Sequence, residues 1–136
     1  MNERALGGSG LVASIFSKQR DEDGYVKAVP CPTGAQCVFF HPPDNTCRVY
    51  ADRPFECRFY PFLLVNTGQE ASVSVHLHCP YIQAQRHTVA FSKHVKRLQS
   101  YFQKEDVLAW LRNNRLLFGD YSEYHQEIQR LFSLAL

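Results

Sequence analysis

The stretch Cys47-Arg-Val-Tyr-Ala-Asp-Arg-Pro-Phe-Glu-Cys57-Arg-Phe-Tyr-Pro61 carries the strongest signal in this chain. It places two thiols ten residues apart around an Arg-Pro turn. Cys37 precedes this stretch and Cys79 follows it, so four cysteines lie on short segments that turns separate. Because thiolates are soft metal ligands, these cysteines are better explained as ligands of zinc or of an iron–sulfur cluster than as inert core residues.

The spacing of the cysteines leaves the metal open. Zinc fingers and ribbons usually supply their ligands in close C-x-x-C pairs, and this sequence has no such pair. A bacterial ferredoxin run needs three thiols within about seven residues, which is also absent. We therefore expect Cys37, Cys47, Cys57 and Cys79 to come singly from separate loops to a site that the fold assembles.

Length and composition favour one globular domain over residues 1–136. With 45% apolar residues, ten Phe and seven Tyr, the chain can bury a real core. A net charge of +2 is too small to indicate nucleic-acid binding. No apolar run approaches the roughly 18–20 residues of a membrane span, and three glycines interrupt the apolar stretch 5–16, so we expect no secretory signal. An odd number of cysteines, five, fits a cytoplasmic protein whose thiols stay reduced or bind metal.

The apolar pattern predicts an α+β fold, with a small β-rich, cysteine-bearing part over residues 1–82 and a helical tail over 83–136. In the first part we expect a glycine-weakened helix at 3–20 and short strands at 25–29 and 37–40. The turn His41–Asn45 should form a hairpin that returns through Cys47–Tyr50. A further pair of strands is predicted at 62–65 and 72–77.

In the tail, apolar residues recur at steps of three and four. This period predicts one helix from residue 83 to Phe102, with Thr88 on its apolar stripe. A second helix is expected from Glu105 to Asn113, and a third with Tyr121, Tyr124, Ile128 and Leu131 on one face. The basic side chains Lys93, Lys96, Arg97 and Lys104 are interpreted as a solvated face of the first of these helices.

One spaced motif runs through the middle of the chain: Cys37-Val-Phe-Phe, Cys47-Arg-Val-Tyr50, Arg53-Pro54, Cys57-Arg58, Tyr60-Pro61-Phe62 and Cys79-Pro80. In this motif the chain resembles the YkgJ-type cysteine-cluster proteins, the CxxCxxCC family, described as a zinc- or iron-chelating domain. The resemblance covers residues 37–80, about a third of the chain. It implies that the four cysteines are metal ligands, and we expect an iron–sulfur cluster ahead of zinc.

The chain departs from the family pattern at its beginning. The family's first half reads C-x-x-C-x-x-C-C, whereas no cysteine precedes Cys31 here. We hypothesise that Met1 is an internal or misassigned start, or that the protein has lost half of its ligands. An in-frame upstream C-x-x-C-x-x-C-C would distinguish the two. Cys31 matches no family position and is expected to be a loop thiol.

Three further residues, two arginines and one histidine, are candidates for the surroundings of the metal. Arg53 and Arg58 lie within four residues of Cys57, so we expect them to donate N–H bonds to thiolates or to offset their charge, as residues behind metal ligands do. His76 and His78 alternate with apolar residues and should share one face of a strand. Of these two, His78 is the one considered as a zinc ligand, because it stands beside Cys79.

Three functions remain open from the sequence. The first is a metal-binding protein whose site is structural or redox-active. The second is an enzyme component, since the resemblance extends loosely to flagellin lysine N-methylases and implies that some relatives modify protein side chains. No independent catalytic or methyl-donor constellation is visible, however. The third is a partner-binding module in which the metal staples the scaffold and the helices after residue 83 present a surface to another protein.

Overall fold

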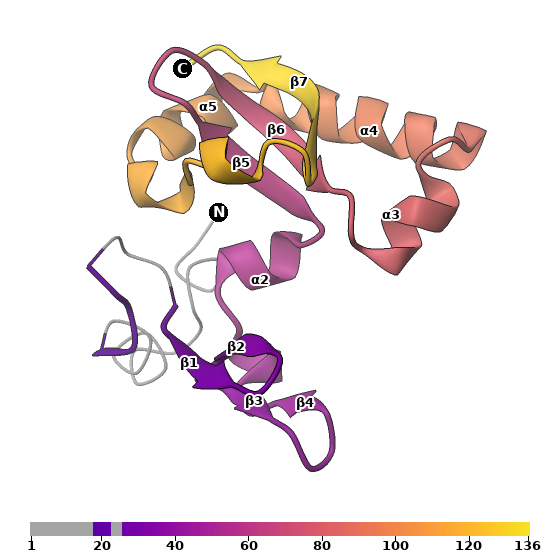
Figure 1. Ribbon diagram of the computed structural model, residues 1–136. Coiled ribbons are helices and arrows are strands. Elements are labelled where there is room, and N and C mark those ends of the chain that lie inside the picture. The colour runs from indigo at the N-terminus through magenta and orange to yellow at the C-terminus, as the bar shows by residue number, and fades with distance from the viewer. Residues whose placement is uncertain (1–17, 23–25) are drawn as a thin grey trace. The chain divides into compact units, whose positions relative to one another are not determined.

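The computed structural model describes residues 18–22 and 26–136 in two compact units, one ending at Arg58 and one beginning at Phe59 (Figure 1). We call these the N-terminal unit and the C-terminal unit. The fold is α+β, as predicted. Most of the helix predicted at 3–20 lies outside the described residues, and a single domain over 1–136 stays a prediction. In the part of the chain that the structure describes, no helix combines the length and the apolar character needed to cross a bilayer.

Two short hairpins and one helical turn make up the N-terminal unit. Strands β1 (Ala28–Cys31) and β2 (Gly34–Cys37) pair antiparallel, as do β3 (Phe40–His41) and β4 (Thr46–Cys47). Asn45 adopts a positive φ of 57° in the β3–β4 turn, a conformation that asparagine tolerates better than most residues. The 3-10 turn η2 (Tyr50–Asp52) and the short helix α2 (Phe55–Phe59) follow.

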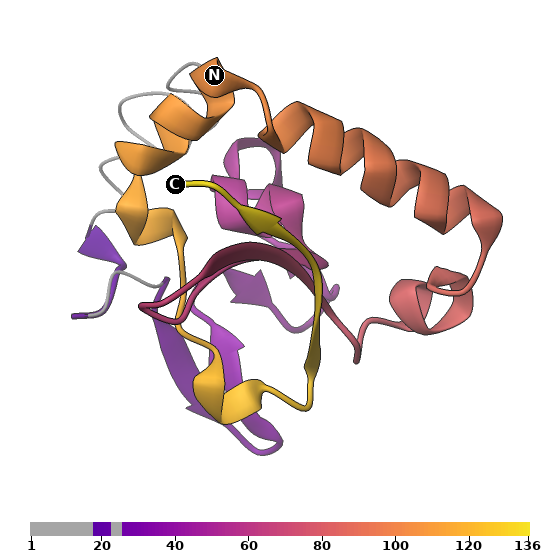
Figure 2. The ribbon, with the colours of Figure 1, turned by 90° about the horizontal axis from the view of Figure 1, so that it is seen from above.

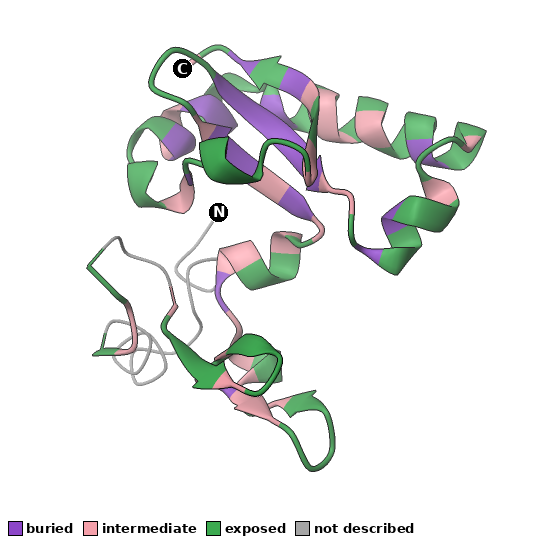
Figure 3. Ribbon diagram, viewed as in Figure 1, coloured by how far each residue is buried: buried purple, intermediate pink, exposed green. Residues whose placement is uncertain are grey.

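The described part of the N-terminal unit contains few buried residues. Phe39 and Pro54 are the buried ones among them, and most of the rest is exposed (Figure 3). Hairpins that bury so little apolar surface gain little stability from the hydrophobic effect. Small domains of this kind usually depend on a metal or a disulfide.

The C-terminal unit is built on a three-stranded antiparallel sheet of order β5-β6-β7. Its strands are β5 (Phe62–Asn66), β6 (Ala71–His76) and β7 (Ile128–Leu134). The helices are α3 (Pro80–Gln85), α4 (Val89–Phe102) and α5 (Glu105–Arg112), followed by the 3-10 turns η3 (Arg115–Leu117) and η4 (Ser122–Tyr124).

Helix α4 packs on one face of this sheet (Figure 2). The ring of Phe91 stacks on that of Phe62 in β5 at 6.3 Å, and Phe102 contacts Phe132 in β7 at the same centroid distance. Val73 and Val75 are fully buried on the central strand β6. Because side chains alternate along a strand, His76 lies on the sheet face opposite to Val75.

The strands predicted at 62–65 and 72–77 and the helix predicted at Glu105–Asn113 are confirmed. The hairpin across the turn His41–Asn45 is also confirmed, although β4 ends at Cys47. The strand predicted at 37–40 lies three residues earlier in the structure, where β2 begins at Gly34 and ends at Cys37. The helix expected from residue 83 to Phe102 is broken: Thr88 caps the start of α4 instead of lying on its apolar stripe.

The third tail helix was a wrong prediction, because Ile128 and Leu131 belong to strand β7. Steps of three and four from Tyr121 to Leu131 fit a helix, but Phe132 and Leu134 also fit the two-residue period of a strand. The exposed edge of β6 decides between them: β7 pairs with it from Ala71↔Leu134 to His76↔Ile128. Long-range pairing therefore overrides a local helical period.

Candidate metal centre

Three of the four predicted thiol ligands belong to the N-terminal unit, each on a different element. Cys37 is the last residue of β2, Cys47 the last of β4, and Cys57 the middle of α2. Cys47 pairs with Phe40, and the N–H of Arg48 donates to the carbonyl of Phe39 at 2.9 Å. This pairing holds the end of β4 beside the residues that directly follow Cys37.

The three thiols lie close enough to influence one another. Partial burial, together with the charges of Glu56, Cys37 and Cys47, raises the pKa of Cys57 to about 11, while the charge of Arg53 acts in the opposite direction. Cys57 is nevertheless exposed at the surface and not enclosed in a core. Mutual repulsion between such thiolates disfavours their joint ionisation unless a cation lies among them.

Cys37 has a hydrogen bond that suits a thiolate. The backbone N–H of Phe39, two residues further along the chain, donates to Cys37 Sγ at 3.4 Å. A donor aimed at sulfur stabilises its ionised form and orients it as a ligand.

Arg53 and Arg58 fasten the turn that carries Cys57. Arg53 Nη1 donates to the carbonyl of Tyr50 at 2.8 Å, and its guanidinium carbon lies 3.9 Å from the centre of the Tyr50 ring. Arg58 Nε donates to the carbonyl of Arg53 at 2.8 Å. These bonds go to backbone oxygens; the positive charge of Arg53 also lowers the pKa of Cys57. A direct role of either guanidinium toward a bound metal stays a prediction.

Glu56, the neighbour of Cys57, is a feature that the sequence did not indicate. Its Oε1 accepts a hydrogen bond from Arg20 Nη1 at 2.9 Å. Its Oε2 is buried, and no described residue donates to it. A buried acceptor without a donor is costly, and a cation beside it removes that cost.

The remaining two cysteines lie elsewhere. Cys31 is at the turn of the β1–β2 hairpin, where it pairs with Gly34, while Cys37 is at the opposite end beside Ala28. Cys31 Sγ lies 3.5 Å from the Thr33 hydroxyl, and this contact lowers the pKa of the thiol. Cys79 belongs to the C-terminal unit, where it is buried directly before α3. There it lies close enough to Tyr60 to raise the pKa of that phenol, which burial already raises.

A family model described as "Putative zinc- or iron-chelating domain", named CxxCxxCC, matches residues 9–80, which is just over half of the chain. The chain belongs to this family. No match was found among curated proteins or among solved structures. The match confirms the resemblance predicted from the cysteine motif and extends it toward the N-terminus, from residue 37 to residue 9.

The residues of this CxxCxxCC domain fit a zinc or iron centre. Three thiols from separate elements, an N–H aimed at one sulfur and a buried carboxylate oxygen without a described donor all favour a bound cation. Thiolate ligands suit both zinc and iron–sulfur clusters, so the donor set supports metal binding without choosing between them. Such a metal would supply the positive charge that the clustered thiolates lack.

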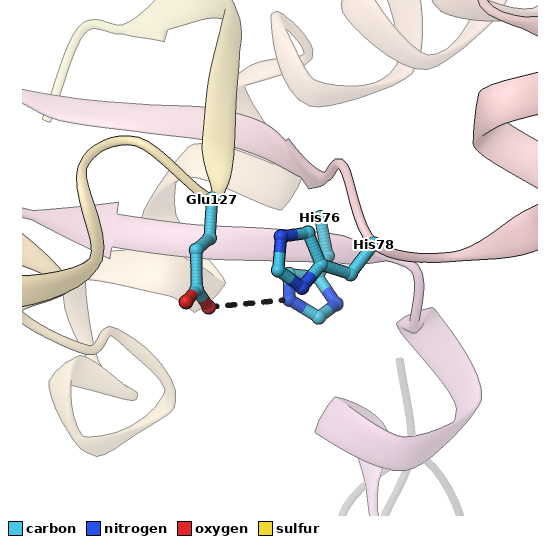
Figure 4. A group of neighbouring side chains, drawn as sticks. All are labelled: His76, His78 and Glu127. Atoms are coloured by element: carbon cyan, nitrogen blue, oxygen red, sulfur yellow. Dashed lines mark ion pairs between the residues drawn. The ribbon is translucent and has the colours of Figure 1, made fainter.

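A second group of potential ligands lies in the C-terminal unit. Donor atoms of His76, His78 and Glu127 lie within 4.8 Å of one another (Figure 4). The sequence indicated the two histidines as neighbours on a strand but not Glu127, because only the arrival of β7 beside β6 places that residue there. The Leu77 N–H donates to the Glu127 carbonyl at 2.8 Å and fixes this juxtaposition.

Proposed function

We propose that this CxxCxxCC domain holds an iron–sulfur cluster, or zinc as the second choice, through the thiolates of Cys37, Cys47 and Cys57. The observation that carries the proposal is the match of residues 9–80 to a zinc- or iron-chelating family, in which these three thiols lie on three separate elements. Cys79 is the fourth ligand that the sequence motif adds.

The sparse core of the N-terminal unit supports the same proposal. With Phe39 and Pro54 as the buried residues among those described, the hairpins and α2 need another source of stability. Metal binding supplies folding free energy to small domains of this kind, because the ligand set is brought together only in the folded state. The metal then holds together the ends of β2 and β4 and the middle of α2.

The iron–sulfur cluster keeps the first place that the sequence prediction gave it, with zinc as the second choice. Single ligands from separate elements suit both cofactors. The surroundings suit either cofactor: Arg53 offsets negative charge at Cys57, and the Phe39 N–H donates to a sulfur.

The test is the metal and acid-labile sulfide content of the full chain purified without oxygen, together with its visible spectrum. Iron with sulfide and a broad visible absorbance supports the cluster. Stoichiometric zinc in a colourless protein supports thiolate chelation but overturns the choice of cofactor. Protein that is folded and still takes up neither metal overturns the proposal.

Variants assign the ligands. Cys57→Ser should abolish metal content, whereas Cys31→Ser, at the far end of the β1–β2 hairpin, should retain it. Cys79→Ser tests the fourth ligand separately, since this residue belongs to the other unit. Equal metal content in Cys57→Ser and Cys31→Ser would contradict the assignment.

A further inference from the structure

His76, His78 and Glu127 converge at one end of the β6–β7 pair. His76 ends β6, His78 follows two residues later, and Glu127 directly precedes β7. Their side chains project into the same space (Figure 4), with His76 Nε2 3.8 Å from Glu127 Oε2 and the two imidazole ring centres 5.5 Å apart. Ligands around zinc at roughly 2.0–2.2 Å lie about 3–3.5 Å from one another, so small side-chain rotations close this group on an ion.

His76 is held in an orientation that leaves Nε2 for a ligand. Its Nδ1 lies 3.0 Å from the Tyr60 hydroxyl, and the two rings are 5.8 Å apart. When Nε2 binds a metal, Nδ1 carries the hydrogen and donates it to the tyrosine oxygen. This arrangement, in which the second ring nitrogen of a ligating histidine has its own partner, is the usual one in metal sites.

A simple ion pair explains the group less well. At 3.8 Å, the His76–Glu127 contact is too long for a hydrogen bond, and it leaves His78 outside the pair. A partly exposed pair of this kind also contributes little to stability. A divalent cation would engage all three donors at once.

The cluster borders a pocket of about 240 Å³ in the same unit. His76 and Glu127 line it together with the rings of Tyr60, Tyr121 and Tyr124. Three protein ligands leave at least one coordination position of a bound ion open, as in catalytic rather than structural zinc sites. The pocket gives a small molecule room to reach that position.

We propose that His76, His78 and Glu127 form a second metal site, which takes a divalent transition-metal ion such as zinc through two imidazoles and one carboxylate. The site is separate from the thiolate centre in its residues and in its chemistry. Nitrogen and oxygen donors with an open position suit zinc or ferrous iron in the divalent state.

The test follows the histidine ring signals of the full chain by nitrogen-detected NMR during titration with zinc. Single substitutions of His76 and His78 by Gln assign their signals, and His87→Gln, at an exposed position outside the cluster, is the control. We expect zinc to shift the His76 and His78 signals with saturation while His87 stays unchanged. Folded wild-type protein in which His76 and His78 do not respond to zinc overturns the proposal.

Affinity adds a second readout. Glu127→Gln keeps the shape of the side chain and removes its charge. It should weaken the affinity for zinc, read from the saturation of the histidine shifts, at least about tenfold, because loss of even an outer partner of a metal site has that effect. Tyr60→Phe should weaken it within the same roughly 10–100-fold range without removing a ligand. Unchanged affinity in Glu127→Gln overturns the assignment of that ligand. Both variants leave every cysteine in place, so a change in zinc affinity in them is distinguishable from metal binding by the thiols.

Discussion

At the scale of single residues, Arg53 is the positive charge that opposes the rise in the Cys57 pKa. The thiol is otherwise pushed toward its protonated form by partial burial and by the charges of Glu56, Cys37 and Cys47. Since a metal binds the thiolate, any group that favours ionisation at Cys57 also favours the metal. We therefore expect Arg53 to influence metal binding, although its hydrogen bond goes to the Tyr50 carbonyl.

We expect Arg53→Gln to weaken metal binding, because it removes this charge while leaving every thiol in place. Competition with a chelator of known affinity measures the change. Arg58→Gln is the matched control: it also removes a guanidinium that donates to a backbone carbonyl, but the charge at Arg53 remains. A metal affinity in Arg53→Gln equal to that of the wild type, or a larger loss in Arg58→Gln, would contradict this role.

The sequence identified the thiols more readily than their surroundings. Cys37, Cys47 and Cys57 follow from the spaced motif, because ligands and their neighbouring prolines are local features. Glu56 could not be selected in the same way, since the lack of a described donor to its buried Oε2 depends on three-dimensional packing. Glu127 was missed for a related reason: it meets His76 only through pairing of distant strands.

At the scale of elements, Thr88 separates α3 from α4. Its hydroxyl accepts a hydrogen bond from the Phe91 N–H at 3.1 Å and donates one to the Gln85 carbonyl at 2.8 Å. Periodicity alone placed Thr88 inside one long helix, because a threonine at an apolar position and a threonine cap look the same in sequence. The cap allows α4 to begin at Val89 as a separate helix, from which Phe91 stacks on Phe62 of the sheet.

We expect Thr88→Ala to destabilise the protein by about 1 kcal/mol, the usual cost of losing an N-cap side chain. Thr88→Ser keeps the hydroxyl and should lose much less. Urea unfolding monitored by circular dichroism compares the three proteins. Equal losses in the alanine and serine variants would mean that the methyl group, rather than the cap, is responsible.

The loop between β5 and β6 is tied to β7 by a carboxylate. Glu70 accepts hydrogen bonds from the Ser133 hydroxyl and from Arg130 Nη1, the latter at 2.7 and 2.8 Å. The Ser133 bond, followed by the charge of Arg130, lowers the pKa of Glu70. A carboxyl group whose pKa is lower in the folded state stabilises the fold above its unfolded pKa and loses this contribution as the pH falls through the folded value.

We therefore expect Glu70→Gln to be less stable than the wild type near neutral pH and equally stable in acid, once the wild-type carboxyl group is protonated. The difference should shrink as the pH falls below the unfolded pKa, about 4.3. Urea unfolding at a series of pH values measures it. A constant difference at all pH values would show that the effect does not come from the ionised carboxylate.

At the scale of the whole molecule, the two units differ in what stabilises them. The C-terminal unit has a conventional core, in which Val73, Val75, Ile82 and Leu111 are fully buried. In the described part of the N-terminal unit, Phe39 and Pro54 are the buried residues. The hydrophobic effect therefore stabilises the three-stranded sheet, while the cysteine-bearing hairpins have little apolar burial to support them.

This difference predicts an unequal response to metal removal. If a thiolate-bound metal holds the N-terminal unit together, a strong chelator should abolish hydrogen-exchange protection of the amides in β1 to β4 and leave that of β5 and β6 largely intact. Hydrogen exchange read by mass spectrometry, with and without chelator, resolves the two regions. The Cys57→Ser variant should reproduce the chelated pattern without chelator, because it removes a ligand and leaves the sheet untouched. Retained protection in β1 to β4 after complete loss of the metal would mean that the hairpins are stable without it and that the metal serves chemistry rather than folding.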